Sequence, residues 1–171
     1  MKRFTQSVLA MVLMSAFFFG GSVSTAEAKG PKILQFDTMV GVPAGLTGTQ
    51  SQVPLRGING GGIPWTVADA TGNLRANGHL EISVEGLVFA AGPNIGKNTI
   101  TSFRGLVSCI TNTGAVVNIL TDPFPATTGP AELGGGNATI EADLNIPSPC
   151  IAPIIFVTNP TGGAWFASTG F

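Results

Sequence analysis

The chain has no tyrosine, a single histidine and few charged residues. Of its 171 residues only 10% are Asp, Glu, Lys or Arg, and the formal net charge is −1. Phosphate binding needs clustered lysine and arginine, so this composition argues against a nucleic-acid-binding protein. With His79 as the only histidine and tyrosine absent, few side chains remain for a catalytic acid–base set.

The sequence also lacks the short motifs that mark common enzymes and cofactor-binding proteins. It contains no G-x-S-x-G nucleophile elbow, no P-loop and no Rossmann glycine pattern. We therefore expect a protein without catalytic residues and without a bound cofactor or metal. An exported enzyme of unrecognised type is the alternative, since acids on different strands, such as Glu81 with Glu141 or Asp143, meet only in the folded chain.

The one long hydrophobic run stands at the start of the sequence. Lys2 and Arg3 precede 8-VLAMVLMSAFFFGG-21, and the small residues Ala26 and Ala28 follow, a pattern typical of a secretory signal peptide. We predict that residues 1–28 are removed, that the mature chain begins at Lys29 and that it is periplasmic or extracellular. No segment reaches the roughly 20 apolar residues of a membrane-spanning helix, so none is expected in the mature chain.

Cysteine occurs only twice, at Cys109 and Cys150. In an exported chain an even pair indicates a disulfide, with two buried thiols as the alternative. The bridge would close a loop of about 40 residues and stabilise the fold by about 3 to 4.5 kcal/mol. There is no second cysteine pair and no CxxC spacing, which argues against zinc and redox sites.

Glycine is abundant, with 24 residues dispersed among short apolar or alternating runs. Many short strands joined by Gly, Pro and Asn predict an all-β fold, an antiparallel β-sandwich or jelly-roll-like barrel, as a single domain over residues 29–171. A small outer-membrane β-barrel is the rival architecture, because such barrels often end in phenylalanine, as Phe171 does here. The expected strands are 33–40, 51–58, 63–70, 73–76, 79–89, 99–110, 115–122, 137–146, 150–158 and 163–169.

The turn between two of these strands sets their register. A three-residue loop, Ala76-Asn77-Gly78, places Leu74 opposite Leu80 and puts a glycine where a left-handed residue is needed. The apolar faces of the two strands then match, whereas a two-residue turn would point Arg75 into the core. Segments 79–89 and 137–146 both alternate, with one apolar and one polar face, while 150–157 is apolar throughout and predicts a central strand.

The polar face of the 79–89 segment is the first candidate site. Arg75, His79, Glu81 and Glu85 are predicted to share this face as a solvated, charge-compensated surface. Glu85 lies roughly 13 Å beyond Glu81 along an extended strand, too far to share a metal ion with it. The positive charge of Arg75 would repel a divalent cation, and nothing in the sequence marks a third ligand on another strand. We therefore expect no metal there.

The aromatic residues are the second candidate. Trp65, Trp165 and Phe166 are predicted either to form a stacking platform for a sugar or to belong to the core, as such residues commonly do in sandwiches. With few charges on the chain, the partners that fit best are a neutral surface, a carbohydrate or a second copy of the protein.

The stretches 103-FRGLVSC-109, 147-PSPCIAPIIFVT-158 and 162-GGAWFASTG-170 resemble segments of small exported bacterial proteins of the hypothetical class. The resemblance covers most of the mature chain. It implies export, one domain and a disulfide, and it implies no activity, ligand or catalytic residue. The sequence thus predicts an exported, non-catalytic β-sandwich that acts by binding or as a structural or surface component of the cell envelope or extracellular matrix.

Overall fold

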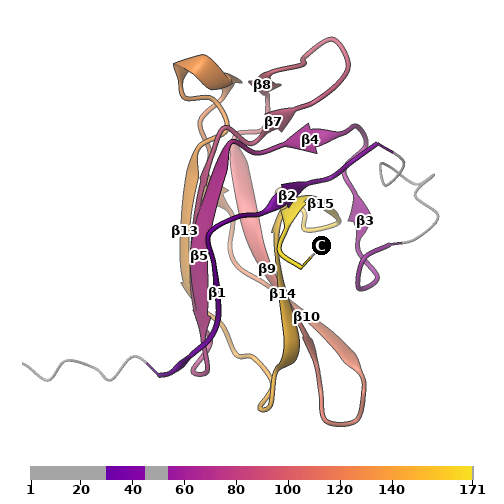
Figure 1. The fold of residues 1–171 in the computed structure, drawn as a ribbon, viewed down its shortest axis with the longest axis vertical. Coiled ribbons are helices and arrows are strands. Elements are labelled where there is room, and N and C mark those ends of the chain that lie inside the picture. Colours follow the sequence, from indigo (N-terminus) through magenta and orange to yellow (C-terminus); the bar gives the residue numbers. More distant parts are fainter. Residues whose placement is uncertain (1–29, 45–53, 171) are drawn as a thin grey trace, which may run out of the picture.

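The computed structural model describes residues 30–44 and 54–170, which form two β-sheets packed face to face (Figure 1). The predicted signal peptide, residues 1–28, and the cleavage point before Lys29 lie outside the described residues. Within those two ranges the chain has 15 strands and a short 3-10 helix, η1 (Ala131–Leu133), so the all-β prediction is confirmed. In the same part of the chain, no helix is long and apolar enough to cross a membrane.

The first sheet has four antiparallel strands in the order β1-β5-β6-β13. Their bounds are β1 (Lys32–Phe36), β5 (Asp69–Arg75), β6 (His79–Glu85) and β13 (Ala138–Asp143). The hairpin between β5 and β6 has the predicted register, because Leu74 pairs with Leu80 and Gly78 adopts a φ of +90°. This register puts the apolar residues of both strands on one face of the sheet.

The second sheet has seven strands and lies against the first. Its main order is β10 (Val116–Leu120), β9 (Ser102–Ile110), β14 (Ile151–Thr158), β15 (Ala164–Ser168) and β2 (Val40–Gly41). Two short strands join its sides: β11 (Phe124–Pro125) pairs with β9, and β3 (Asn59–Gly60) runs parallel to β15. Two further short pairs are β4 (Trp65–Thr66) with β7 (Val88–Phe89), and β8 (Lys97–Asn98) with β12 (Gly129–Pro130).

Several predicted strands differ from the observed ones. Segment 79–89 is divided into β6, in the four-stranded sheet, and β7, which pairs with β4, while segment 73–76 is the end of β5. Segment 33–40 is divided into β1 and β2, which belong to different sheets, so the chain crosses between the layers at residues 37–39. Segment 63–70 is likewise divided between β4 and the beginning of β5. The described part of segment 51–58 is a turn closed by a bridge between Leu55 and Ile58. Strand propensity does not reveal where a chain changes sheet, because that depends on distant pairing partners.

The core lies between the two sheets. Leu80, Ile82 and Ile140 of the first sheet are buried, and so are Val107 and Ile155 of the second. The alternation predicted for 79–89 and 137–146 is therefore confirmed on its apolar side. A Cβ added at Gly105 would lie 3.1 and 3.2 Å from the side chains of Leu80 and Ile82, so the two layers meet closely at this glycine.

β14 is the central strand that its apolar sequence predicts. It lies between β9 and β15, and Ile155, Phe156 and Val157 are fully buried. Residues 54–58 cross the outer side of this sheet, where Nη2 of Arg56 donates a hydrogen bond to the carbonyl of Ala152. The first part of the strand is more open, since Ile151 is 45% exposed.

Trp65, Trp165 and Phe166 do not form an exposed platform. Their exposed fractions are only 4%, 1% and 5%, and all three belong to the hydrophobic core. Trp65 stacks on Phe166, with ring centroids 4.0 Å apart. Since a sugar cannot reach these rings in the folded chain, the platform hypothesis is wrong and the core interpretation holds.

The predicted disulfide joins Cys109 to Cys150, with their Cα atoms 4.9 Å apart. Cys109 is buried on β9, and Cys150 immediately precedes β14. The bridge therefore anchors the start of β14 beside β9, just before the irregular register between Ile151 and Ile154.

Candidate functional site

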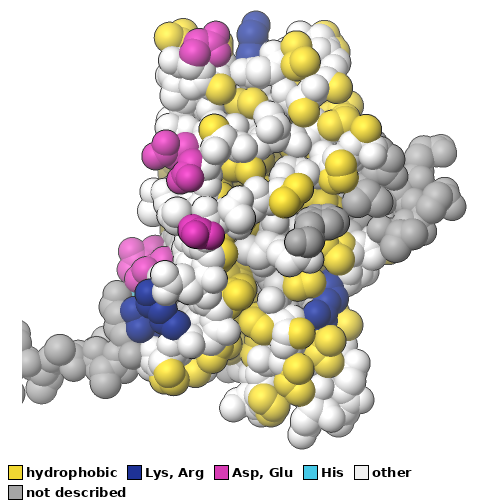
Figure 2. Space-filling model, in the orientation of Figure 1, with side chains coloured by type: hydrophobic (Ala, Val, Ile, Leu, Met, Phe, Trp, Pro, Cys, Tyr) yellow, Lys and Arg dark blue, Asp and Glu magenta, His cyan; other side chains and the backbone are white. Residues whose placement is uncertain are grey.

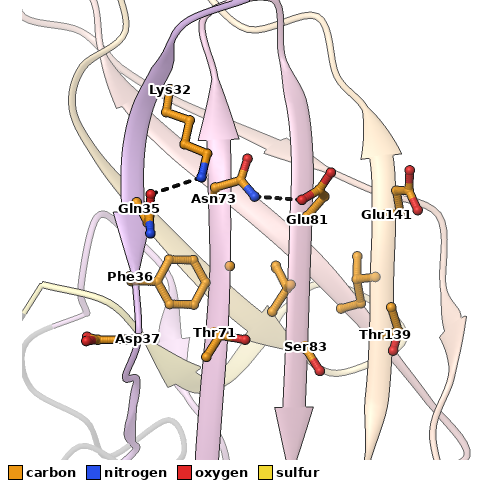
Figure 3. Close-up of a pocket in the computed structure, with 13 residues that line it drawn as sticks. Lys32, Gln35, Phe36, Asp37, Thr71, Asn73, Glu81, Ser83, Thr139 and Glu141 are labelled. Carbon is orange, nitrogen blue, oxygen red and sulfur yellow. Dashed lines mark hydrogen bonds between the residues drawn. The ribbon is translucent and has the colours of Figure 1, made fainter. Parts of the chain in front are cut away.

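The outer face of the four-stranded sheet carries most of the polar side chains that the sequence analysis singled out. Because alternate residues of each strand point away from the core, Gln35, Asn73, Glu81 and Glu141 form one row across all four strands (Figure 3). Glu81 is directly opposite both Asn73 and Glu141. The register of β13 on β6 thus brings together two glutamates that are 60 residues apart in the sequence.

A second row on the same face consists of hydroxyl side chains. Thr71 pairs with Ser83, and Ser83 pairs with Thr139, so the three hydroxyls cross β5, β6 and β13 side by side (Figure 3). Thr71, Ser83 and Thr139 are all exposed. Hydroxyl groups both donate and accept hydrogen bonds, so this row is suited to a partner that does the same.

Both rows line a shallow groove of ≈ 440 Å³. Phe36 forms part of its wall at the β1 side, where its ring lies beside Gly72 on β5 (Figure 3). Gly72 is required here, because a Cβ at this position would overlap the Phe36 ring and the Glu81 carbonyl oxygen. The groove therefore combines one aromatic surface with amide, hydroxyl and carboxylate groups on four strands.

The acidic side chains gather at this side of the molecule. Figure 2 shows Asp and Glu side chains along the edge formed by β1, β5 and β13, with few Lys and Arg between them. Lys32 is the basic residue that lines the groove, and its Nζ donates a hydrogen bond to Oε1 of Gln35 at 3.0 Å. The potential along the face is consequently negative toward β13.

His79 lies at the beginning of β6, inside a ring of carboxylates. Its Nδ1 is 2.8 Å from Oδ1 of Asp143, and its Nε2 is 2.9 Å from Oε1 of Glu81. Glu141 completes the ring, with Oε1 3.9 Å from Nε2. Antiparallel pairing explains the arrangement, because Asp143 is directly opposite His79 and Glu141 is directly opposite Glu81.

The expectation of a solvated His79 is wrong, because the residue is only 8% exposed. Of the other members of the predicted polar face, Arg75 lies across the hairpin from His79, one position beyond the pair of Leu74 and Leu80, whereas Glu85 lies at the far end of β6. Nη1 of Arg75 donates a hydrogen bond to the Gly30 carbonyl, and Glu85 is exposed opposite Asp69, about 20 Å along the strand from His79. The prediction missed that β13 supplies two carboxylates to His79, and no local pattern signals that pairing.

Burial among these carboxylates gives His79 a role in stability. Replacing it with alanine removes the group that separates the carboxylates of Glu81, Glu141 and Asp143, so we expect His79→Ala to lower the free energy of unfolding by about 1 to 2 kcal/mol. Urea denaturation measures this change. Glu85→Ala is the control, because it removes an exposed carboxylate from the same strand face and is expected to change stability by less than about 0.5 kcal/mol. Equal effects of the two substitutions would contradict the assignment.

Comparison of the chain with protein-family models, with curated proteins and with solved structures finds no match. The resemblance to small exported bacterial proteins therefore stays a prediction.

Proposed function

We propose that this chain is an exported, non-catalytic binding protein that holds a neutral, hydroxyl-rich ligand, such as a stretch of carbohydrate, in the groove on the four-stranded sheet. In this role it is a component of the cell envelope or the extracellular matrix. The observation that carries the proposal is the row of hydroxyl side chains that lines this groove beside a row of amide and carboxylate side chains. The disulfide supports export, because such bonds persist in oxidising compartments.

Hydroxyl groups of a ligand match this lining, because its amides and hydroxyls donate and accept hydrogen bonds and its carboxylates accept them. Gln35, Thr71, Ser83 and Thr139 offer neutral donors and acceptors, so a sugar exchanges hydrogen bonds with water for similar ones with the protein. The Phe36 ring adds an apolar surface of the kind that packs against the C–H side of a sugar. Because these groups stand on paired strands, little order has to be gained when the ligand binds.

A direct test is co-sedimentation of the purified protein with insoluble polysaccharides, including cellulose, chitin and peptidoglycan, at low and high salt. Binding should be nearly independent of salt, because few ion pairs are involved. Thr139→Arg places a long charged side chain in the hydroxyl row and should weaken binding at least about tenfold. The matched control is Thr128→Arg, at an exposed threonine outside the groove.

Three results would contradict the proposal: no binding to any polysaccharide, capture that disappears at high salt, or equal losses for Thr139→Arg and Thr128→Arg.

Association of the protein with itself is measured alongside by analytical ultracentrifugation. A dimer that is disrupted by Thr139→Arg would show that the groove binds a second copy instead of a glycan.

The alternative function, an exported enzyme, rests on the pair Glu81 and Glu141. Glycosidases use two carboxyl groups, and these residues face each other across β6 and β13. The same co-sedimentation samples are assayed for newly released reducing ends. Reproducible turnover that is lost in Glu81→Gln or Glu141→Gln would replace the binding proposal with a catalytic one.

A further inference from the structure

Both ring nitrogens of His79 face carboxylate oxygens, and a neutral imidazole cannot donate a hydrogen bond to both. Both ring nitrogens lie within 2.9 Å of a carboxylate oxygen, Nδ1 at Asp143 and Nε2 at Glu81. Ionised carboxylates accept hydrogen bonds and donate none, whereas a neutral imidazole has only one N–H. One of these two contacts is therefore satisfied only by an additional proton or by a metal cation.

The hydrogen bonds of His79 and Glu81 to neighbouring residues direct Nε2 of His79 and Oε1 of Glu81 toward each other. Asp143 contacts Nδ1, and a carboxylate at the second ring nitrogen is the usual device that orients a metal-binding histidine. On Glu81, Nδ2 of Asn73 donates to Oε2 at 2.7 Å, which turns Oε1 toward Nε2 of His79. Asp143 and Asn73 thus orient His79 and Glu81 through Nδ1 and Oε2, while Nε2 and Oε1 are the atoms that would bind the metal.

Glu141 supplies the third ligand that the sequence did not mark. One ligand atom from each of His79, Glu81 and Glu141 lies within 4.8 Å of the others. Ligand atoms around tetrahedral Zn²⁺ are about 3.3 Å apart when the metal–ligand bonds are about 2.0 to 2.2 Å. The observed separations from Nε2, 2.9 Å to Glu81 and 3.9 Å to Glu141, bracket that spacing. Glu141 has a 64% exposed side chain and is therefore able to adjust.

The buried side-chain oxygen of Asn73, beside His79, Glu81 and Glu141, also indicates that a metal-bound water belongs at this site. Asn73 is only 8% exposed, and its Oδ1 has no hydrogen-bond partner among the described residues. In Figure 3 this oxygen points along β5 toward the end of the sheet where β6 begins, which is the position of His79. A metal with three protein ligands carries water at its open position, and such a water is a donor of the kind that this oxygen lacks.

We propose that His79, Glu81 and Glu141 bind a divalent transition-metal cation of the zinc class, with Asp143 and Asn73 as the residues that orient the ligands. The imidazole ligand distinguishes this site from calcium and magnesium sites, which use oxygen ligands. Three carboxylates around one histidine also leave an excess of negative charge. Arg75, which lies across the hairpin from His79, offsets part of this excess, and its Nη1 donates a hydrogen bond to the Gly30 carbonyl.

Isothermal titration calorimetry of the purified, chelator-treated protein with ZnCl₂ tests the site, with CaCl₂ as the hard-cation comparison. One Zn²⁺ per chain is expected, together with a melting temperature that rises with Zn²⁺ and falls again with EDTA. Glu141→Gln and His79→Gln remove ligands and should weaken binding by more than about tenfold, and Asp143→Asn by about 10- to 100-fold. Glu85→Gln, at an exposed carboxylate on the same strand face, should leave the affinity unchanged.

If His79→Gln fails to fold, Glu141→Gln still tests the site, because Glu141 has an exposed side chain and its substitution is expected to leave the fold intact. The proposal is overturned by the absence of stoichiometric Zn²⁺ binding, by equal affinities in Glu141→Gln and Glu85→Gln, or by tighter binding of Ca²⁺ than of Zn²⁺. In the first case an additional proton, and not a metal, satisfies the second contact of the His79 ring. Glu81 and Glu141 also line the groove, so glycan binding is tested with Thr139→Arg, which removes no metal ligand, and the failure of either proposal is recognised by its own variants.

Discussion

Replacing Cys109 and Cys150 together with alanine lowers the free energy of unfolding by about 4 kcal/mol. The bridge spans 41 residues, and its loss returns the corresponding loop-closure entropy to the unfolded chain. Alanine is preferred to serine, because Cys109 is fully buried and a hydroxyl there would need a hydrogen-bond partner. Urea denaturation of the oxidised protein and of the double variant measures the difference.

Reduced wild-type protein is the control for this experiment. It should lose the same stability as the double variant, apart from the small volume change of the substitutions. A loss below about 1 kcal/mol in both samples would show that the bridge contributes little, either because it strains the native state or because the unfolded chain stays compact.

Gly78→Ala is expected to cost at least about 3 kcal/mol, because the substitution faces two separate penalties. Gly78 has a φ of +90°, and a Cβ at this position would overlap the carbonyl oxygen of Leu144. That carbonyl cannot withdraw freely, since the backbone N–H of Leu144 donates a hydrogen bond to the Gly78 carbonyl at 3.0 Å. Chemical denaturation measures the loss.

Gly114→Ala provides the matched control. Gly114 also has a positive φ, of +83°, but a Cβ there would meet no atom within 4 Å. This variant therefore reports only the conformational penalty, about 1 to 2 kcal/mol. If the two variants lose equal stability, the packing of Leu144 against the hairpin is not the cause of the effect.

Local patterns explain the part of this structure that was predictable. The two-residue alternation in 79–89 and 137–146 predicted the buried faces of β6 and β13, whose observed bounds are shorter, because side chains alternate between the faces of every strand. Gly78 predicted the hairpin register, because a left-handed position follows from turn length alone. The disulfide followed from the predicted export and from an even cysteine count.

Only the tertiary structure decided which residues meet across the sheets. More than 50 residues separate β6 from β13, and their register places Asp143 opposite His79 and Glu141 opposite Glu81. Burial of the aromatic cluster around Trp65 and Phe166 depends in the same way on contacts between distant segments. A strand pattern shows which face is polar, but the pairing partner and its register are set by the packing of the whole sandwich. For this reason the sequence determined the fold class and the polar face, whereas the carboxylate ring around His79 and the groove beside it arose only on folding.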